Sequence, residues 1–173
     1  HNTALGYRAL YTSDGGEQNV AIGSHSMDEL TTGDKNVAVG YWALGGDAVT
    51  SDGNTAVGTM SLMEVTSGSN NTAIGIDSGK NITTGGYNTA LGGSALDACT
   101  TGQKNVAVGF GALTDLTTGQ YNIAIGENCL ADLETADQCV AIGMDALRKN
   151  TTAEYNVAVG SQAAKEVTTG QRN

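Results

Sequence analysis

Aromatic and cationic side chains recur at a fixed spacing in this sequence. Tyr87, Tyr121 and Tyr155 lie 34 residues apart, and Lys104 and Arg172 each follow a tyrosine by 17 residues. Flat tyrosine rings stack on the faces of sugar rings, while cations and amides bind sugar hydroxyls. The pattern predicts a binding site for a glycan or a host-surface receptor. The alternative is that the tyrosines shield a turn and pack beside a neighbouring asparagine.

Residues for catalysis or metal binding are scarce. The two histidines are His1 and His25, and neither belongs to a Ser/His/Asp or Cys/His arrangement. Phosphate-binding glycine loops and the GGxGxD nonapeptides of calcium-binding β-rolls are absent. We therefore expect no enzyme activity, no cofactor and no metal. Several carboxylates fall in predicted turns and are expected to be solvated, namely Asp14, Asp34, Asp52, Glu64 and Asp137.

The spacing of these residues follows an internal repeat, Asn-x-Ala-x-Gly. Successive copies start 17 residues apart, except for one interval of 18 residues between Asn36 and Asn54. We expect the extra residue to form a small bulge in the turn within residues 45–53. The ten copies start at residues 2, 19, 36, 54, 71, 88, 105, 122, 139 and 156.

Each copy is numbered here from position 1, the Asn, to position 17. Position 2 is Thr, Val or Ile, position 3 is always Ala, position 4 is Leu, Ile or Val, and position 5 is always Gly. An apolar site near position 12 precedes Thr-Thr-Gly or a related turn. The unit is short, lacks a 3.6-residue apolar period and is punctuated by glycine, which favours strands and turns. One unit cannot bury a face alone, so the units must stack.

These features predict an all-β fold, a parallel β-solenoid with one repeat per rung. Residues 1–173 would form a single repeat domain, and ten rungs spaced by about 4.8 Å give a rod about 48 Å long. We expect a five-residue strand at positions 1–5 and a second, shorter strand near the Ala-Leu of positions 8 and 9. Because both ends of the chain fall within the repeat, we expect the domain to be a segment of a longer fibre.

Alternation along a strand divides positions 1–5 between two faces. We predict that positions 2 and 4 form the inner wall and pack against the leucines of the second strand. A face that is small in every copy indicates a close neighbour, and we predict a second subunit against it, with the facing wall of the same chain as the alternative. The candidate interface residues are Ala4, Ala21, Ala38, Ala56, Ala73, Ala90, Ala107, Ala124, Ala141 and Ala158.

Asparagines that stack on successive rungs can hydrogen-bond to each other as a ladder. Cys139 replaces the asparagine in one copy and is expected to interrupt the ladder. The three cysteines, Cys99, Cys129 and Cys139, show neither a CxxC motif nor a Cys/His metal-binding spacing. We therefore predict that all three are small buried residues. The predicted ladder comprises Asn19, Asn36, Asn54, Asn71, Asn88, Asn105, Asn122 and Asn156.

Composition limits the function further. The 173 residues include 25 Gly and no Pro, and a chain without Pro can donate every backbone N–H to a continuous ladder. The formal net charge of −10 disfavours binding to nucleic acid. No apolar run of about 18 residues is present, so membrane insertion is not expected. Tyr7, Tyr41, Trp42 and Phe110 lie in another variable turn and predict a second patch or a subunit contact.

The repeated phrases NVAVG, NTAIG and NIAIG, with AL and TTG between them, resemble the head repeats of YadA-like trimeric autotransporter adhesins. The 17-residue form with Thr-Thr-Gly more closely resembles repeats of phage and virus tail-fibre proteins that carry a C-terminal intramolecular chaperone. The resemblance covers the whole chain. It implies a left-handed β-roll in which three chains pack about a common axis.

Three functions are consistent with the sequence. The first is a structural and adhesive fibre segment, extracellular on a virion fibre or a cell surface, which presents binding sites to glycans as a homotrimer. The second is a subunit of a self-assembling extracellular filament. The third is an ice- or surface-binding solenoid that uses its Thr-Thr pairs. It is disfavoured because adjacent threonines of an extended chain point to opposite sides.

Overall fold

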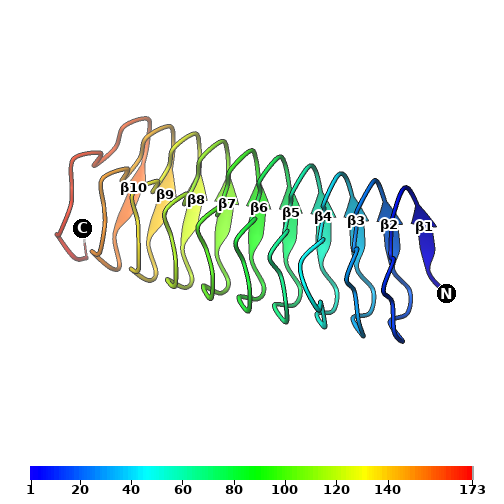
Figure 1. The fold of residues 1–173 in the computed structure, drawn as a ribbon. Coiled ribbons are helices and arrows are strands. Elements are labelled where there is room, and N and C mark those ends of the chain that lie inside the picture. Colours follow the sequence, from blue (N-terminus) through cyan, green and yellow to red (C-terminus); the bar gives the residue numbers. More distant parts are fainter. Residues whose placement is uncertain (173) are drawn as a thin grey trace.

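The computed structural model describes residues 1–172 and shows a β-solenoid in which each repeat forms one rung (Figure 1). Every rung contributes one short strand to a single parallel sheet of ten strands, which follow one another in sequence order. The predicted all-β solenoid is confirmed. The strands are β1 (Thr3–Leu5), β2 (Val20–Ile22), β3 (Val37–Val39), β4 (Thr55–Val57), β5 (Thr72–Ile74), β6 (Thr89–Leu91), β7 (Val106–Val108), β8 (Ile123–Ile125), β9 (Val140–Ile142) and β10 (Val157–Val159).

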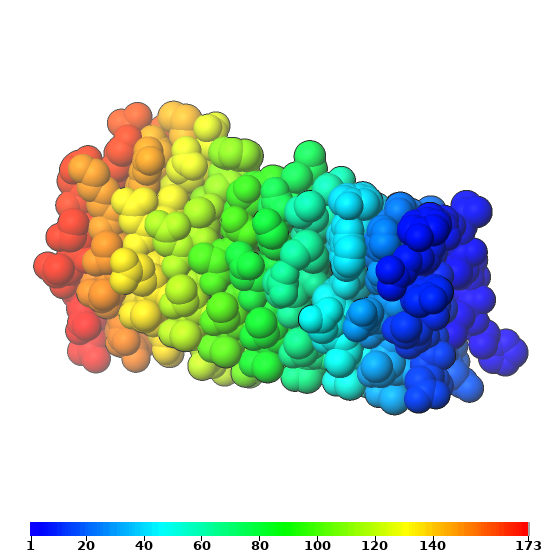
Figure 2. Space-filling model, viewed as in Figure 1, coloured from blue at the N-terminus to red at the C-terminus, as the bar shows by residue number. Residues whose placement is uncertain are grey.

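Neighbouring rungs stack without an offset. Each residue of a strand pairs with the residue at the same position of the next repeat, as Ala107 does with Ala124. Backbone hydrogen bonds continue the stacking outside the strands; the Leu113 N–H, for example, donates to the Cys129 carbonyl at 3.1 Å. Successive repeats therefore form bands across the long axis of a rod (Figure 2). The absence of Pro fits this geometry, because the rungs are joined mainly through their backbone N–H groups.

The strands are shorter than expected, and the second strand is not formed within the described residues. Each strand covers only positions 2–4. The glycine at position 5 takes a φ between 128° and 143° and so ends the extended segment. Positions 7 and 9 are left-handed in every rung, which gives the following segment a series of turns where we predicted a strand. The nearest feature to the predicted strand is an isolated parallel bridge between Leu30 and Val49.

Left-handed backbone forms three columns along the rod, at positions 7, 9 and 17. In one rung these positions are Gly111, Leu113 and Tyr121, with φ of 64°, 52° and 60°. Val, Ile and Thr are absent from all three columns. A branched Cβ clashes with the backbone at positive φ, so the columns exclude these residues while tolerating Leu, Lys, Tyr and Gln.

The prediction of which face points inward is wrong. The alanines of position 3 have almost no accessible surface from Ala21 to Ala158, and only Ala4, in the first rung, is exposed. They pack in one core with the leucines of position 9 and the apolar residues of position 12. Residues at positions 2 and 4 are half-buried or exposed instead. An alanine without accessible surface cannot contact another subunit, so the facing wall of the same chain is the close neighbour.

The small residues point inward because the solenoid is narrow. One wall supplies alanine and the opposite wall supplies leucine, so the two fill the interior together. The glycines of position 5 are required by the distance between rungs, since a Cβ on Gly109 would lie 2.6 Å from the carbonyl oxygen of Gly126. The cross-section leaves no room for two opposed walls of large side chains.

The predicted asparagine ladder is confirmed, and its bonds also join opposite parts of each rung. The Oδ1 of Asn88 accepts the backbone N–H of Asn105 at 2.9 Å. The Nδ2 of Asn105 donates across the interior to the Gly119 carbonyl at 2.8 Å. The same pair of bonds recurs along the rod, so buried amides are satisfied without water.

Cys139 lacks the side-chain amide of the ladder, and Asn150, at another position of the same rung, supplies one instead. The Cys139 N–H still donates to Asn122 Oδ1 at 2.9 Å, and its thiol contacts the Ala153 carbonyl at 3.1 Å. Asn150 occupies the apolar position 12 of this rung and is fully buried. Its amide donates to the Ala153 carbonyl at 2.8 Å and accepts the Ala153 N–H at 2.9 Å. Cysteine at position 1 is therefore accompanied by an asparagine at position 12.

The extra residue of the third repeat is accommodated in the turn, as predicted. Ala48 takes a left-handed φ of 55° at a point where no other rung has a left-handed residue. Val49 is fully buried and restores the stacking through its bridge to Leu30. The next strand, β4, pairs with β3 in the common register. The insertion is thus absorbed within one rung and does not shift the sheet.

Leu113→Val should destabilise the chain by about 1–2 kcal/mol more than Leu116→Val, because valine at a left-handed position carries backbone strain. Both leucines are fully buried, and only Leu113 is left-handed. Position 12 already holds Val65 and Ile82 in other rungs. Urea unfolding followed by circular dichroism measures the difference. Equal losses from the two substitutions would show that the left-handed column does not select its residues.

Asn105→Ala should lower the free energy of unfolding by about 2–4 kcal/mol, because it leaves the Asn122 N–H and the Gly119 carbonyl buried without their partners. Gln103→Ala, an exposed change in the adjacent turn, serves as the control. The same urea titration compares the two variants. A change at Asn105 no larger than that at Gln103 would contradict a structural role for the ladder.

Candidate glycan-binding surface

The residues at position 17 form one continuous row along the rod, called here the tyrosine row. From Lys35 onward, each donates its backbone N–H to the carbonyl of position 16 in the preceding rung, as Tyr121 does to Gln103 at 3.1 Å. Lys104 therefore lies in the rung between Tyr87 and Tyr121. The row reads Gln18, Lys35, Gly53, Asn70, Tyr87, Lys104, Tyr121, Gln138, Tyr155 and Arg172.

Every member of the row has a left-handed φ close to 60°, and this common backbone turns the side chains outward in a similar way. The three tyrosines are 61%, 48% and 41% exposed, in chain order. The rings are therefore accessible to a ligand. Among the predicted site residues, Tyr87, Lys104, Tyr121, Tyr155 and Arg172 are thus brought into one exposed row.

Cations and rings pair within the row. Lys104 Nζ donates to the Tyr121 hydroxyl at 3.0 Å and lies 4.9 Å from the centre of that ring. The Arg172 guanidinium lies 5.8 Å from the centre of the Tyr155 ring. The hydrogen bond with Tyr121 raises the pKa of Lys104 above its ordinary value, with further support from the charge of Tyr121. Its ammonium therefore stays charged at neutral pH.

An open pocket of about 410 Å³ borders the row. It is lined by Tyr121, Gln138 and Val140. Tyr121 and Gln138 belong to successive rungs of the row, while Val140 begins strand β9 at position 2. The pocket therefore marks the boundary between the tyrosine row and the outward side of the sheet, and it offers a ring, an amide and an apolar wall to one ligand group.

Carboxylates in the neighbouring turns accept hydrogen bonds from backbone N–H groups. Asp137 Oδ1 accepts the Gln120 N–H at 2.6 Å, and Asp52 Oδ1 accepts the Asp34 N–H at 2.7 Å. Asp34 does the same for Glu17 at 2.7 Å. These side chains bind the turn of the preceding rung at position 16. Asp34 and Asp137 are half-buried, whereas Asp14, Asp52 and Glu64 are exposed, as expected of solvated carboxylates.

An aromatic cluster at positions 6 and 7 joins the first three rungs. The rings of His25 and Trp42 are stacked, with centres 4.7 Å apart, and Tyr7 and Tyr41 meet His25 edge-on at 5.4 and 6.3 Å. Phe110 lies four rungs away. The predicted second patch therefore forms from Tyr7, Tyr41 and Trp42 but without Phe110.

Polar groups under this cluster were not anticipated from the sequence. Asp28 is only 2% exposed, and its carboxylate lies 2.8 Å from His25 Nδ1 and 3.2 Å from Arg8 Nε. Arg8 also lies 4.5 Å from the centre of the Tyr11 ring. Reading positions 6, 7 and 10 down successive copies would have brought these residues together, because rungs stack in register.

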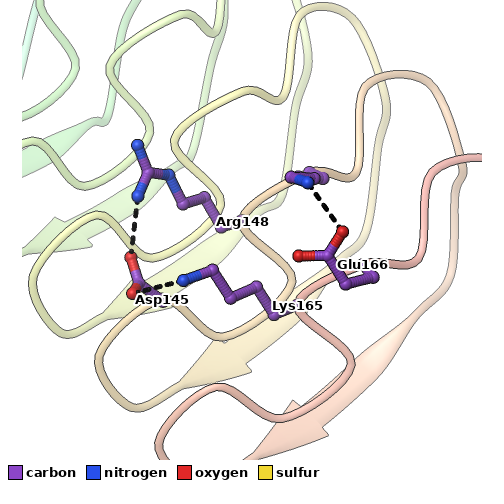
Figure 3. A network of polar contacts seen from close by, with 5 residues as sticks. Asp145, Arg148, Lys165 and Glu166 are labelled. Carbon is purple, nitrogen blue, oxygen red and sulfur yellow. Dashed lines mark hydrogen bonds and ion pairs between the residues drawn. The ribbon is translucent and has the colours of Figure 1, made fainter.

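A second ionic group lies near the C-terminal end of the described chain. Asp145 is placed between Arg148 and Lys165, with distances of 3.3 and 2.9 Å (Figure 3). Lys149 pairs with Glu166 at 2.6 Å. The hydrogen bond from Lys165 lowers the pKa of Asp145, and that from Lys149 lowers the pKa of Glu166. The contacts of Lys165 with Asp145 and of Lys149 with Glu166 join adjacent rungs, while Arg148 pairs with Asp145 within one rung.

The three cysteines are buried and free, as predicted. Burial raises the pKa of the Cys99 and Cys129 thiols to about 11, so both stay protonated at neutral pH. The Cys129 thiol donates to the Ala141 carbonyl of the next rung. Ser26 makes the equivalent contact to the Ala38 carbonyl. The cysteines thus substitute for small buried residues.

The two threonines of each Thr-Thr pair lie in different environments. At position 13 the Thr83 hydroxyl donates to the Thr100 carbonyl of the next rung at 3.1 Å, and Thr100 donates to Thr117 at 3.2 Å. Thr84, Thr101 and Thr118 at position 14 are exposed. Only one threonine of each pair faces solvent, so the pairs do not form a flat surface of two columns.

Within residues 1–172 no three or more His, Cys, Asp or Glu side chains are grouped so that they could hold a metal ion. The same range contains no helix long and apolar enough to span a membrane. The candidate site is the tyrosine row with its pocket, which offers rings, one ammonium and amides to a ligand.

Tyr121→Phe should lower the pKa of Lys104, because the substitution removes the hydroxyl that accepts from the charged ammonium. The lysine Nζ and Cε resonances, followed by NMR as pH rises, report the change. Tyr155→Phe leaves this contact intact and is the matched control. An unchanged Lys104 titration in the Tyr121 variant would mean that the hydroxyl does not hold the ammonium in solution.

Comparison of the chain with protein-family models, with curated proteins and with solved structures found no match.

Proposed function

We propose that this chain is a rigid segment of an extracellular fibre, on a phage tail fibre or a cell-surface adhesin, which associates with further copies of itself and presents the tyrosine row to glycans. The observation that carries the proposal is an outward, apolar strip that runs the full length of the sheet. This strip, called here the outer face, consists of the residues at positions 2 and 4.

The outer face combines exposure with a lack of charge. Its twenty positions hold only Thr, Val, Ile and Leu, although the chain carries 26 charged residues, 18 acidic and 8 basic. Ile74, Ile125 and Ile142 keep 44%, 38% and 38% of their surface accessible. Parallel sheets usually have both faces covered, and a contiguous apolar strip on a soluble surface indicates an interaction site.

A second copy of the chain is the partner that fits this strip best. The strip is straight and periodic, and its side chains repeat with the spacing of the rungs. An identical strip on another rod has the same period, so the two can interdigitate along their whole length. The number of three copies follows from the resemblance to trimeric adhesin heads and tail-fibre repeats. Contact through the β-branched residues replaces the contact through alanine that the sequence suggested.

The tyrosine row lies beside the outer face, since Val140 of the outer face and Gln138 of the row line the same pocket. In an assembly that covers the outer face, the exposed row would remain at the rim of the contact. A stiff rod then places identical binding groups at regular intervals. Such repetition raises the avidity for a polymeric glycan without any new contact.

Ile125→Lys should convert the trimer to a monomer, because three ammonium groups would be placed in an apolar contact. The side chain lies on the outer face and is exposed in the single chain, so the fold should remain. Sedimentation equilibrium gives the mass, and circular dichroism checks the fold. Thr118→Lys, in an exposed turn, is the control.

The mass of the unaltered chain decides between the alternatives. A trimer supports the proposed fibre. A monomer at all concentrations contradicts self-association through the outer face. An open-ended series of larger masses favours the filament. If Ile125→Lys leaves the trimer intact, the copies associate through another surface.

A further inference from the structure

We propose that the central part of the tyrosine row, Tyr87, Lys104 and Tyr121 with Gln138, binds a linear acidic polysaccharide that carries one carboxylate per disaccharide. This inference rests on the proposed function and specifies its ligand. Neutral glycans would also stack on the rings. What distinguishes the acidic class is the arrangement of charge around the row.

Within residues 1–172, the basic residues that form no ion pair with a carboxylate all lie in this row. Five of the eight basic residues form ion pairs with carboxylates, and these are Arg8, Lys80, Arg148, Lys149 and Lys165. The other three, Lys35, Lys104 and Arg172, have no such pair within residues 1–172. All three occupy position 17. The row also contains no acidic residue, on a chain with 18 of them.

Negative charge is also absent from the turn beside the centre of the row. Position 16 holds Ser69, Gly86, Gln103 and Gln120 in four successive rungs. Carboxylates occupy that position on either side of this stretch, at Asp52 before it and Asp137 after it.

The Asp137 carboxylate accepts the Gln120 N–H at 2.6 Å and so is held against the backbone. Around Lys104 the surface therefore repels an anion least, although the chain as a whole is acidic.

The geometry of the three central residues suits a saccharide chain. Tyr87 and Tyr121 are two rungs apart, about 9.6 Å along the rod, which is comparable to the length of a disaccharide in an extended polymer. Lys104 lies between them. A disaccharide that spans Tyr87 and Tyr121 would therefore meet two rings and one ammonium.

The ammonium of Lys104 contacts Tyr121 and keeps hydrogen-bond donors that are available to a ligand. It has three donors, of which one is directed to the Tyr121 hydroxyl at 3.0 Å. Contact with the Tyr121 ring holds the long side chain in one place, which reduces the entropy lost when an anion binds. Two donors remain for a carboxylate, and the pocket lined by Tyr121, Gln138 and Val140 can receive a ring substituent.

Nucleic acid fits the same surface poorly. Its phosphates are spaced at about 3.4 Å along a strand, more closely than the rungs, and each needs a cation. The row supplies one cation between Tyr87 and Tyr121, and the net charge of −10 repels a dense polyanion. A polymer with one carboxylate per two sugars would place a single carboxylate beside the single cation that lies between Tyr87 and Tyr121.

The test uses hyaluronan decasaccharide, which has one carboxylate per disaccharide, and the same oligosaccharide with its carboxyl groups reduced to alcohols. Isothermal titration calorimetry should show that the chain binds the acidic form about three- to tenfold more tightly. Lys104→Gln should abolish this preference and leave the affinity for the reduced form unchanged. Lys149→Gln, which removes a cation paired with Glu166 on another column, should keep the preference.

The outcomes separate this inference from the proposed function. Tyr87→Ala and Tyr121→Ala should weaken binding of both forms, since the rings stack on either. Equal binding of the two forms by the unaltered chain overturns the acidic ligand but leaves a glycan-binding row. Loss of preference with Lys149→Gln, or its retention with Lys104→Gln, also overturns the inference. If neither form binds while neutral glycans bind through the tyrosines, only the ligand class is wrong.

Discussion

Rung-to-rung hydrogen bonding in a fixed register is the constraint on which the rest of this structure depends. Each strand has only three residues and could not persist alone. It is stable because its N–H and C=O groups pair with identical segments above and below. Zero offset makes each position of the repeat a column, so the properties of one residue type extend along the whole rod.

Several features of the interior follow from this close stacking. Glycine is required at position 5, because a Cβ on Gly109 would meet the backbone of the next rung. The asparagines of position 1 hydrogen-bond both to the next rung and across their own rung. Their side-chain amides are therefore buried with their hydrogen bonds satisfied. The exchange at Cys139 and Asn150 shows that the amide can come from a different position, provided that the buried carbonyl of Ala153 keeps a donor.

The outside of the rod is divided by the same columns. Positions 2 and 4 carry no charge, position 16 uses carboxylates to bind turns, and position 17 holds three tyrosines and the three basic residues that form no ion pair. Left-handed backbone at position 17 excludes branched side chains but permits many others. Variation there is compatible with the fold, which is why specificity for a ligand can reside in that column. The fold supplies the spacing, and the variable residues supply the chemistry.

The sequence alone determined the period, the all-β solenoid, the asparagine ladder and the buried state of the cysteines. These depend on spacing and residue type, which a repeat displays ten times. It also identified Tyr87, Lys104 and Tyr121 as members of one row. The stretch of position 16 that lacks carboxylates beside this row can also be found from the sequence, because aligning the copies is enough to show it.

Only the tertiary structure decided which face of the strand is inside. Alternation separates positions 2 and 4 from position 3, but it is symmetric between the two faces. The width of the interior breaks that symmetry: leucine from one wall leaves room only for alanine on the other, so the β-branched residues face outward. Alignment of the copies brings His25 near Asp28 and Lys104 near Tyr121, but the contacts between these side chains required coordinates. Side-chain direction in a left-handed turn depends on backbone angles that residue spacing does not specify.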